Sequence, residues 1–213
     1  MQEAFLGGWA RQASFSVEVL APLYDLNLRF LDLLASRGAR RIRGSEDLPA
    51  GTWERVAPMS APQRAAAAQC PYALFDLRFN DETHWKARLC GAGQWRIADE
   101  SAEDGASQDA ANFVRLALFY AWHVASTGRH AVRLLLGMSE LTAGAFRAST
   151  LACLPSLVAS ETANLTARFC NCGVYWSALM SAAARRDAHR LRKVQLFGLQ
   201  LAAASLLPSE QSH

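Results

Sequence analysis

The fold is decided by the stretch from Ala131 to Trp176, AVRLLLGMSELTAGAFRASTLACLPSLVASETANLTARFCNCGVYW. Within it, Gly137 is a natural C-cap for one helix and Ser139 is a natural N-cap for the next. Pro155 can open a third helix, because the N–H that proline lacks has no partner in a first helical turn. The stretch therefore predicts three short helices followed by a connector, at about 129–136, 139–149 and 154–162.

A similar pattern occurs about ninety residues earlier in the chain. Asn80 stands five residues before Trp85, Asn171 stands five residues before Trp176, and an Arg-Phe pair precedes each asparagine. In both stretches the sequence Trp-x-Ala-x-(Leu or Met) follows, and a proline opens a short helix upstream. This order favours an internal duplication, and a chance match is the alternative. The question comes first because a missed repeat changes the whole predicted architecture.

Composition favours a helical protein of modest charge. The chain has 213 residues, of which 51% are hydrophobic and 19% charged. Alanine is common and β-branched residues are few, which favours helix over strand. A net charge of +3 does not by itself indicate a nucleic-acid-binding protein. Five cysteines, an odd number, do not suggest a disulfide framework, so a reducing cytoplasm is the expected compartment.

The sequence predicts a soluble protein without membrane association. The N-terminus lacks the basic region and long apolar core of a signal peptide. The longest apolar run, from Leu116 to Ala125, is interrupted by His123. It is much shorter than the roughly 20 residues that a helix needs to cross a bilayer.

The remaining segments also read as helices joined by polar loops. The stretch from Ser14 to Ala35 is apolar around most of its circumference, so it must be covered from several sides, either within the monomer or by a second subunit. Residues 91–106 form an acidic, glycine-containing linker between the segments 1–90 and 107–213. We therefore expect an all-α fold of two tandem, similar halves packed as a pseudo-dimer. Further helices are predicted at about 60–70, 81–89, 108–126, 174–184 and 185–207, with a short strand or extended connector at about 72–79.

The sequence indicates neither a metal site nor a catalytic site. Cys170 and Cys172 are the one close pair of cysteines, whereas a structural zinc site usually needs two such pairs. His123 lies in the apolar half of a helix, which favours a buried structural histidine over a general base. Nucleophile motifs and glycine-rich phosphate loops are absent from the sequence. We predict no metal, no cofactor and no enzyme; an enzyme would require a pocket that gathers His123 or the cysteines with a carboxylate.

Two arginine-rich segments are candidates for contacts with DNA phosphates. The first is a loop in which Glu46 and Asp47 follow the arginines, so a solvated, partly neutralised loop is the preferred interpretation there. The second is predicted to form one face of the last helix, where a solvated face that keeps the protein soluble is an equal alternative. The phosphate-contact candidates are Arg37, Arg40, Arg41, Arg43, Arg186, Arg190 and Lys193.

The order of several motifs resembles the FlhD family, the flagellar transcriptional activator subunit of proteobacteria. Residues 23–28, LYDLNL, with the following FLDLL at 30–34, resemble the first helix of that family. The segment from Pro62 to Asn80 resembles the region that leads into its aromatic-Arg-Phe motif. In the second half, residues 136–140, LGMSE, resemble the family's Leu-Gly-hydrophobic-Ser-Glu helix start, and the segment from Leu154 to Phe169 follows in the expected order.

The resemblance implies a small all-helical fold that pairs into dimers and acts in transcription beside a partner subunit, FlhC, which carries zinc and much of the DNA contact. The first half has no counterpart of the LGMSE segment, and the second half has no clear match to LYDLNL. We therefore expect an FlhD-like regulator or regulator subunit, with an FlhC-like subunit or self-association as partner and DNA as a further candidate. The alternative is a helical interaction protein, an anti-activator or scaffold, that mimics an FlhD dimer without binding DNA.

Overall fold

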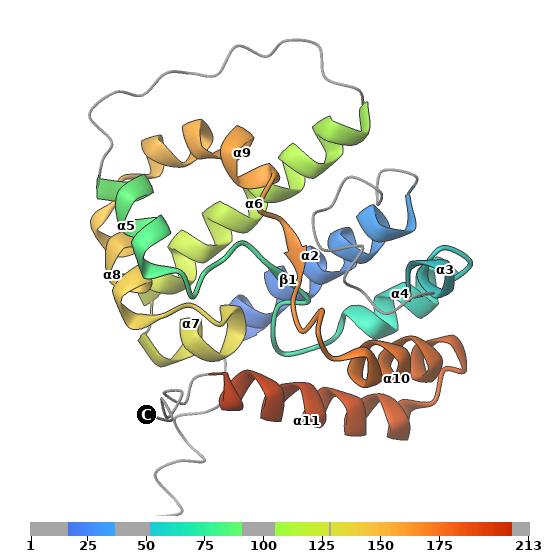
Figure 1. Cartoon of the computed structure of the whole chain (residues 1–213). Coiled ribbons are helices and arrows are strands. Elements are labelled where there is room, and N and C mark those ends of the chain that lie inside the picture. Colours follow the sequence, from blue (N-terminus) through green and yellow to red (C-terminus); the bar gives the residue numbers. More distant parts are fainter. Residues whose placement is uncertain (1–16, 37–51, 91–104, 128, 206–213) are drawn as a thin grey trace, which may run out of the picture.

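The structure is a computed structural model that describes residues 17–36, 52–90, 105–127 and 129–205 (Figure 1). The described part is mostly helical, which confirms the predicted all-α class. A 3₁₀ turn at Leu151–Cys153 and two short antiparallel strands, β1 (Phe75–Asp76) and β2 (Thr166–Ala167), complete it. The helices are α2 (Val17–Ala35), α3 (Thr52–Val56), α4 (Ala61–Ala68), α5 (Glu82–Cys90), α6 (Gly105–Thr127), α7 (Arg129–Leu136), α8 (Glu140–Ala148), α9 (Leu154–Thr162), α10 (Gly173–Ala184) and α11 (Ala188–Ala204).

Local capping signals place the helices of the second half as predicted. Helices α7 and α9 have the predicted bounds, and α8 lies within the predicted range. Gly137 follows α7 with a φ of 69°, a left-handed conformation that favours glycine. The Ser139 hydroxyl accepts a hydrogen bond from the Thr142 N–H at the start of α8. The expected extended segment at 72–79 contains β1.

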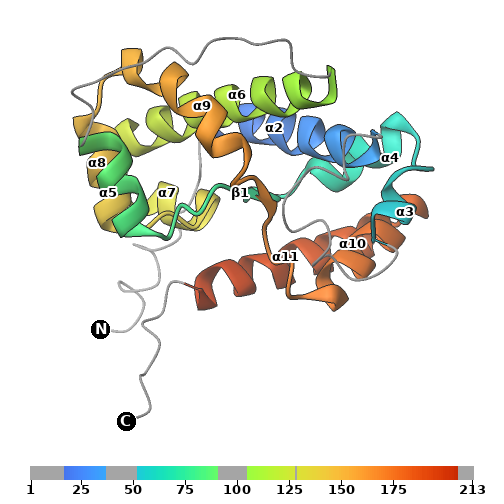
Figure 2. The ribbon, with the colours of Figure 1, turned by 45° about the horizontal axis from the view of Figure 1, so that its top comes forward.

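The two long helices, α2 and α6, pack side by side in opposite directions at the centre of one group of helices (Figure 2). The Tyr120 hydroxyl, in the second half of α6, donates to the Val19 carbonyl in the first turn of α2 at 3.0 Å. Phe113 and Phe30 meet at the opposite ends of these helices, with ring centroids 5.7 Å apart. Helices α10 and α11 form a second group, and β1 and β2 lie between the two groups. Buried side chains from both halves of the chain join in one core.

Asn27 ties α2 to the segment that leads into β1. Its side chain is fully buried, and its amide nitrogen lies within 3.2 Å of the carbonyl oxygens of Ala68, Cys70 and Tyr72. Its amide oxygen accepts a hydrogen bond from the Leu74 N–H at 2.9 Å. One side chain thus satisfies buried backbone groups of a segment that has no regular helix or strand of its own.

Several features of the structure recur at an offset of 91 residues. The two strands are separated by this distance (75 to 166), and so are the starts of α5 and α10 (82 to 173). Arg78 and Phe169 have the same separation and share a positive φ, of 57° and 58°. Trp85 and Trp176 also match, and each indole N–H donates to an arginine carbonyl, that of Arg78 at 3.1 Å and that of Arg168 at 3.0 Å. The Arg-Phe pairs themselves are shifted by one residue relative to this offset.

Contacts between the two halves of the chain also recur at positions 91 residues apart. Helix α5 packs against α8, and α10 packs against α3, so each half contributes a helix to the other (Figure 1). His84 Nε2 on α5 lies 2.9 Å from the buried Glu161 carboxylate on α9. The equivalent positions are Tyr175, 91 residues after His84, and Cys70, 91 residues before Glu161, and their Oη and Sγ atoms lie 3.8 Å apart.

Helix α11 approaches the core most closely at Gly198. A Cβ at this position would lie 1.9 Å from the hydroxyl oxygen of Tyr72 and 2.9 Å from the ring of Tyr175. These two tyrosines are buried and hydrogen-bonded to each other through their hydroxyl groups at 3.1 Å. Glycine at 198 therefore permits α11 to cover the tyrosine pair directly.

No single helix in the described ranges has both the length and the apolar composition of a membrane span. One pair of consecutive helical segments, Glu140–Ala148 and Leu151–Thr162, passes this test together, and the two meet at an angle of 99°.

Replacing Asn27 by leucine should destabilise the fold by at least about 3 kcal/mol, because several buried backbone groups lose their partner at once. Asn112 provides a matched control on α6, since its amide is exposed and bonds only to neighbouring side chains of the same helix. Asn112→Leu should change the unfolding free energy by no more than about 0.5 kcal/mol in urea titrations. Equal effects of the two substitutions would contradict the role given to Asn27.

The two helical glycines at 144 and 198 should respond in opposite ways to alanine. Gly198→Ala forces a methyl group into the tyrosine pair and should cost about 1–3 kcal/mol. In Gly144→Ala the nearest atom would be 3.8 Å away, so the gain in helix propensity should stabilise the protein by about 0.5–1 kcal/mol. Thermal unfolding of the two variants tests this difference, and a Gly198→Ala variant as stable as the parent would disprove it.

Candidate functional site

A strongly charged surface covers the turn between α10 and α11 and the first turns of α11. We call it the basic turn. Asp187 is the one acidic residue between positions 185 and 193. The basic turn consists of Arg185, Arg186, Arg190, Arg192 and Lys193, all of which are exposed.

A helix C-terminal motif shapes this turn. The N–H groups of Arg186 and Asp187 donate to the carbonyls of Ala183 and Ala182, the two bonds of a Schellman motif. Arg186 occupies the left-handed position of this motif with a φ of 53°, where glycine is the usual residue. The chain then turns into α11, and Asp187 caps that helix by accepting from the Arg190 N–H at 3.0 Å.

The predicted start of the last helix at Arg185 is therefore wrong, because residues 185–187 form a turn. Helix α10 ends at Ala184 and α11 begins at Ala188. Arg186 lies in the turn, so it does not belong to the same helical face as Arg190 and Lys193. The three side chains still come from one short, exposed segment, and the structure brings them onto the same end of α11.

The positive charges of the basic turn lie at a helix N-terminus, where negative charges are usually favoured. The N-terminus of a helix carries a partial positive charge, and cations in the first turns are therefore unfavourable there. In this region Arg190 pairs with Asp187, with Nε and Oδ2 3.3 Å apart. The helix start and the remaining cations add to one positive potential, which is suited to an anion.

An open groove of about 450 Å³ lies beside the basic turn, between α4 and α11. We call it the α4–α11 groove. It combines two arginines, two glutamines and apolar side chains, and none of the described residues that line it is acidic, a histidine or a cysteine. Its lining residues are Pro62, Ala66, Gln69, Arg186, Ala188, Leu191, Arg192 and Gln195.

The other predicted residues have different outcomes. Arg37, Arg40, Arg41 and Arg43 lie outside the described residues, as does most of the linker at 91–106. The prediction that His123 is a buried histidine is wrong, because its side chain is exposed on α6. Its position continues the exposed stripe of Asn112 and Leu116 along the helix.

Burial shifts the pKa values of two titratable groups in the core, Cys70 and Arg168. Burial raises the pKa of the Cys70 thiol to about 11, so it is protonated at neutral pH and a poor nucleophile. Burial lowers the pKa of the Arg168 guanidinium to about 10, which leaves it charged. Its Nη1 atom donates to the carbonyl of Leu135 at 2.9 Å and thereby caps the end of α7. Among the described residues no group of three or more His, Cys, Asp and Glu side chains could hold a metal.

Sequence reasoning missed the groove. Gln69 and Gln195 are 126 positions apart, yet the Gln195 amide donates to the Gln69 carbonyl at 2.9 Å and holds α11 against the end of α4. No local signal in the sequence joins these residues. The positive charge of Arg192 was visible in the sequence, but its position beside α4 was not.

Replacing Arg186 by glycine should stabilise the protein by about 1 kcal/mol, since it relieves the left-handed backbone strain. The neighbouring Arg185 has ordinary helical angles, with a φ of −84° and a ψ of −6°. Arg185→Gly, which removes the same charge, should instead destabilise the protein by about 0.5–1 kcal/mol. Chemical denaturation distinguishes the two, and a loss of stability in both variants would refute the assignment of strain to Arg186.

No protein-family model, curated protein or solved structure matches this chain, so its function is inferred from its own residues and geometry.

Proposed function

We propose that the chain is an FlhD-like transcriptional regulator, or a subunit of one, that arose by tandem duplication and folds as a pseudo-dimer. It would act through contacts with a protein partner and through the basic turn on DNA phosphates. The observation that carries the duplication is the offset of 91 residues, at which strands, left-handed residues and buried tryptophans recur.

The pairing of β1 with β2 supports this proposal. Phe75 pairs with Ala167, and Asp76 pairs with Thr166. Moving each residue by 91 positions converts the first pair into the second. Two copies related by a two-fold axis make such reciprocal contacts, in which residue i of one copy meets j of the other and j meets i. The ladder therefore has the symmetry expected of a fused dimer.

The exchanged helices give independent support. In a dimer with intertwined subunits, a helix of each subunit packs on the other subunit. Helices α5 and α10 start at equivalent positions and pack against α8 and α3, which belong to the opposite halves. The contacts of His84 with Glu161 and of Tyr175 with Cys70 cross between the halves at matching positions.

The proposed DNA contact rests on the basic turn. Exposed arginine and lysine side chains bind phosphates irrespective of sequence, and the affinity falls steeply as salt concentration rises. The positive end of α11 adds to this attraction. Such a surface positions the protein on a duplex, while sequence discrimination would come from elsewhere, for example from a partner subunit.

The second candidate function is a helical interaction protein, an anti-activator or scaffold that mimics an FlhD dimer. One observation favours it. Leu196 is 61% exposed and lies one turn after Lys193 on α11. The exposed face of α11 thus offers an apolar contact beside its charges, which suits a protein partner. In this case charge changes in the basic turn would leave regulatory activity intact.

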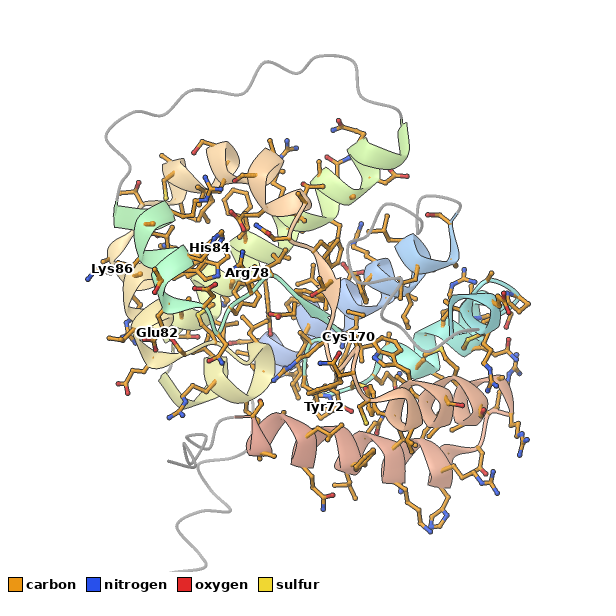
Figure 3. The ribbon with its side chains drawn as sticks, viewed as in Figure 1. Tyr72, Arg78, Glu82, His84, Lys86 and Cys170 are labelled. Atoms are coloured by element: carbon orange, nitrogen blue, oxygen red, sulfur yellow. The ribbon has the colours of Figure 1, made fainter. Side chains whose placement is uncertain are left out.

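A pair of matched lysine variants tests the DNA contact. Lys193 on α11 and Lys86 on α5 are both exposed, and Lys86 points away from α11 (Figure 3). Lys193→Ala should weaken binding of a labelled duplex of about 30 base pairs and lower the slope of log affinity against log salt by about one. Fluorescence anisotropy between about 50 and 200 mM KCl provides both quantities.

Lys86→Ala removes the same charge and should leave both quantities unchanged. Equal losses in the two variants would mean that net charge alone drives binding. If the unmodified protein binds no duplex at low salt, either alone or with a co-purified partner, the DNA role is wrong and the interaction protein remains.

A further inference from the structure

The α4–α11 groove carries an excess of positive charge. Arg186 and Arg192 both line it, and within the part of the chain that the structure describes no acidic residue does. Asp187, the acid nearest in sequence, already caps α11 and pairs with Arg190. Two guanidinium groups that face one groove without a carboxylate favour an anionic occupant.

The groove also has an apolar wall, which an inorganic anion or a DNA phosphate alone would not use. Pro62 and Ala66 on α4 face Leu191 on α11, whose side chain is 8% exposed. The bond from the Gln195 amide to the Gln69 carbonyl holds these two helices together at one side of the groove. An occupant that fills this space gains from burial of apolar surface as well as from charge.

The size of the groove fits a small molecule. About 450 Å³ lies within the range of roughly 300–1,000 Å³ that is usual for ligand sites. The left-handed conformation of Arg186 supplies a second argument, since a non-glycine residue is strained there. A guanidinium that contacts a ligand gives a reason for an arginine at this position.

We propose that the α4–α11 groove binds a small organic anion, a phosphate or carboxylate group attached to a compact apolar body. The guanidinium groups of Arg186 and Arg192 contact the anionic group, and the apolar body lies between α4 and α11. The ligand would bridge the two halves of the chain. The site shares Arg186 and Arg192 with the basic turn, but its apolar wall plays no part in the proposed DNA contact, so the site stands if that contact fails.

Phenyl phosphate is a suitable probe, with inorganic phosphate and phenol as its separate halves. Isothermal titration of the full chain in a phosphate-free buffer should give binding of phenyl phosphate that is at least about tenfold tighter than that of either half. Arg186→Gly and Arg192→Ala should each weaken this binding about tenfold, the loss expected for a charged hydrogen bond.

Arg185→Ala is the matched control, because Arg185 is exposed in the same turn but does not line the groove. It should change the affinity for phenyl phosphate less than twofold. Ala188→Phe gives an independent check, since Ala188 lines the groove yet is exposed, so a larger side chain fills the groove without entering the core. This variant should abolish binding of phenyl phosphate and leave the thermal unfolding midpoint unchanged.

Three results would overturn the proposal. The first is the absence of measurable phenyl phosphate binding by the folded protein. The second is an equal affinity for inorganic phosphate, which would mean that the apolar wall plays no part. The third is an equal loss of affinity in Arg185→Ala and Arg186→Gly, which would reduce the effect to general surface charge.

Discussion

The hydrogen bonds of Asn27 are the constraint on which the rest of the fold depends. The segment from Ala68 to Leu74 passes through the core without a regular partner, and its polar groups would be costly if unpaired. Asn27 satisfies them from α2 and so fixes the path of the chain into β1. The position of β1 then sets the pairing with β2, and the tyrosine at 72 presents the surface on which Gly198 of α11 lies.

Features encoded by neighbouring residues could be predicted from the sequence. The glycine at 137 and the serine at 139 place the ends of α7 and α8, because caps act within one helical turn. The end of α10 at Ala184 was predicted, but the turn at residues 185–187 was missed because Arg186 takes a position that glycine usually marks. The exposure of His123 was not predicted, because its neighbours in the sequence are apolar and do not indicate which face of the helix is exposed.

Features that depend on distant residues could not be predicted. The partners of Asn27 are 41 to 47 positions away, and no periodicity in the sequence connects them. The α4–α11 groove likewise joins residues more than 110 positions apart (62 to 188). The basic turn could be predicted from the sequence only in part. Its charges are evident in the sequence, but their arrangement at a helix start, against the usual preference, requires the structure.

The packing of Trp85 against the second half of the chain has a consequence for synthesis on the ribosome. Its indole ring lies 4.8 Å from the ring of Phe146 on α8, and the neighbouring His84 contacts Glu161 on α9. The N-terminal segment therefore cannot close its core until more than seventy further residues (90 to 161) have been translated and have left the exit tunnel. During that interval the aromatic surface around Trp85 lacks these partners, and exposed apolar surface of this kind makes an incomplete chain prone to aggregation.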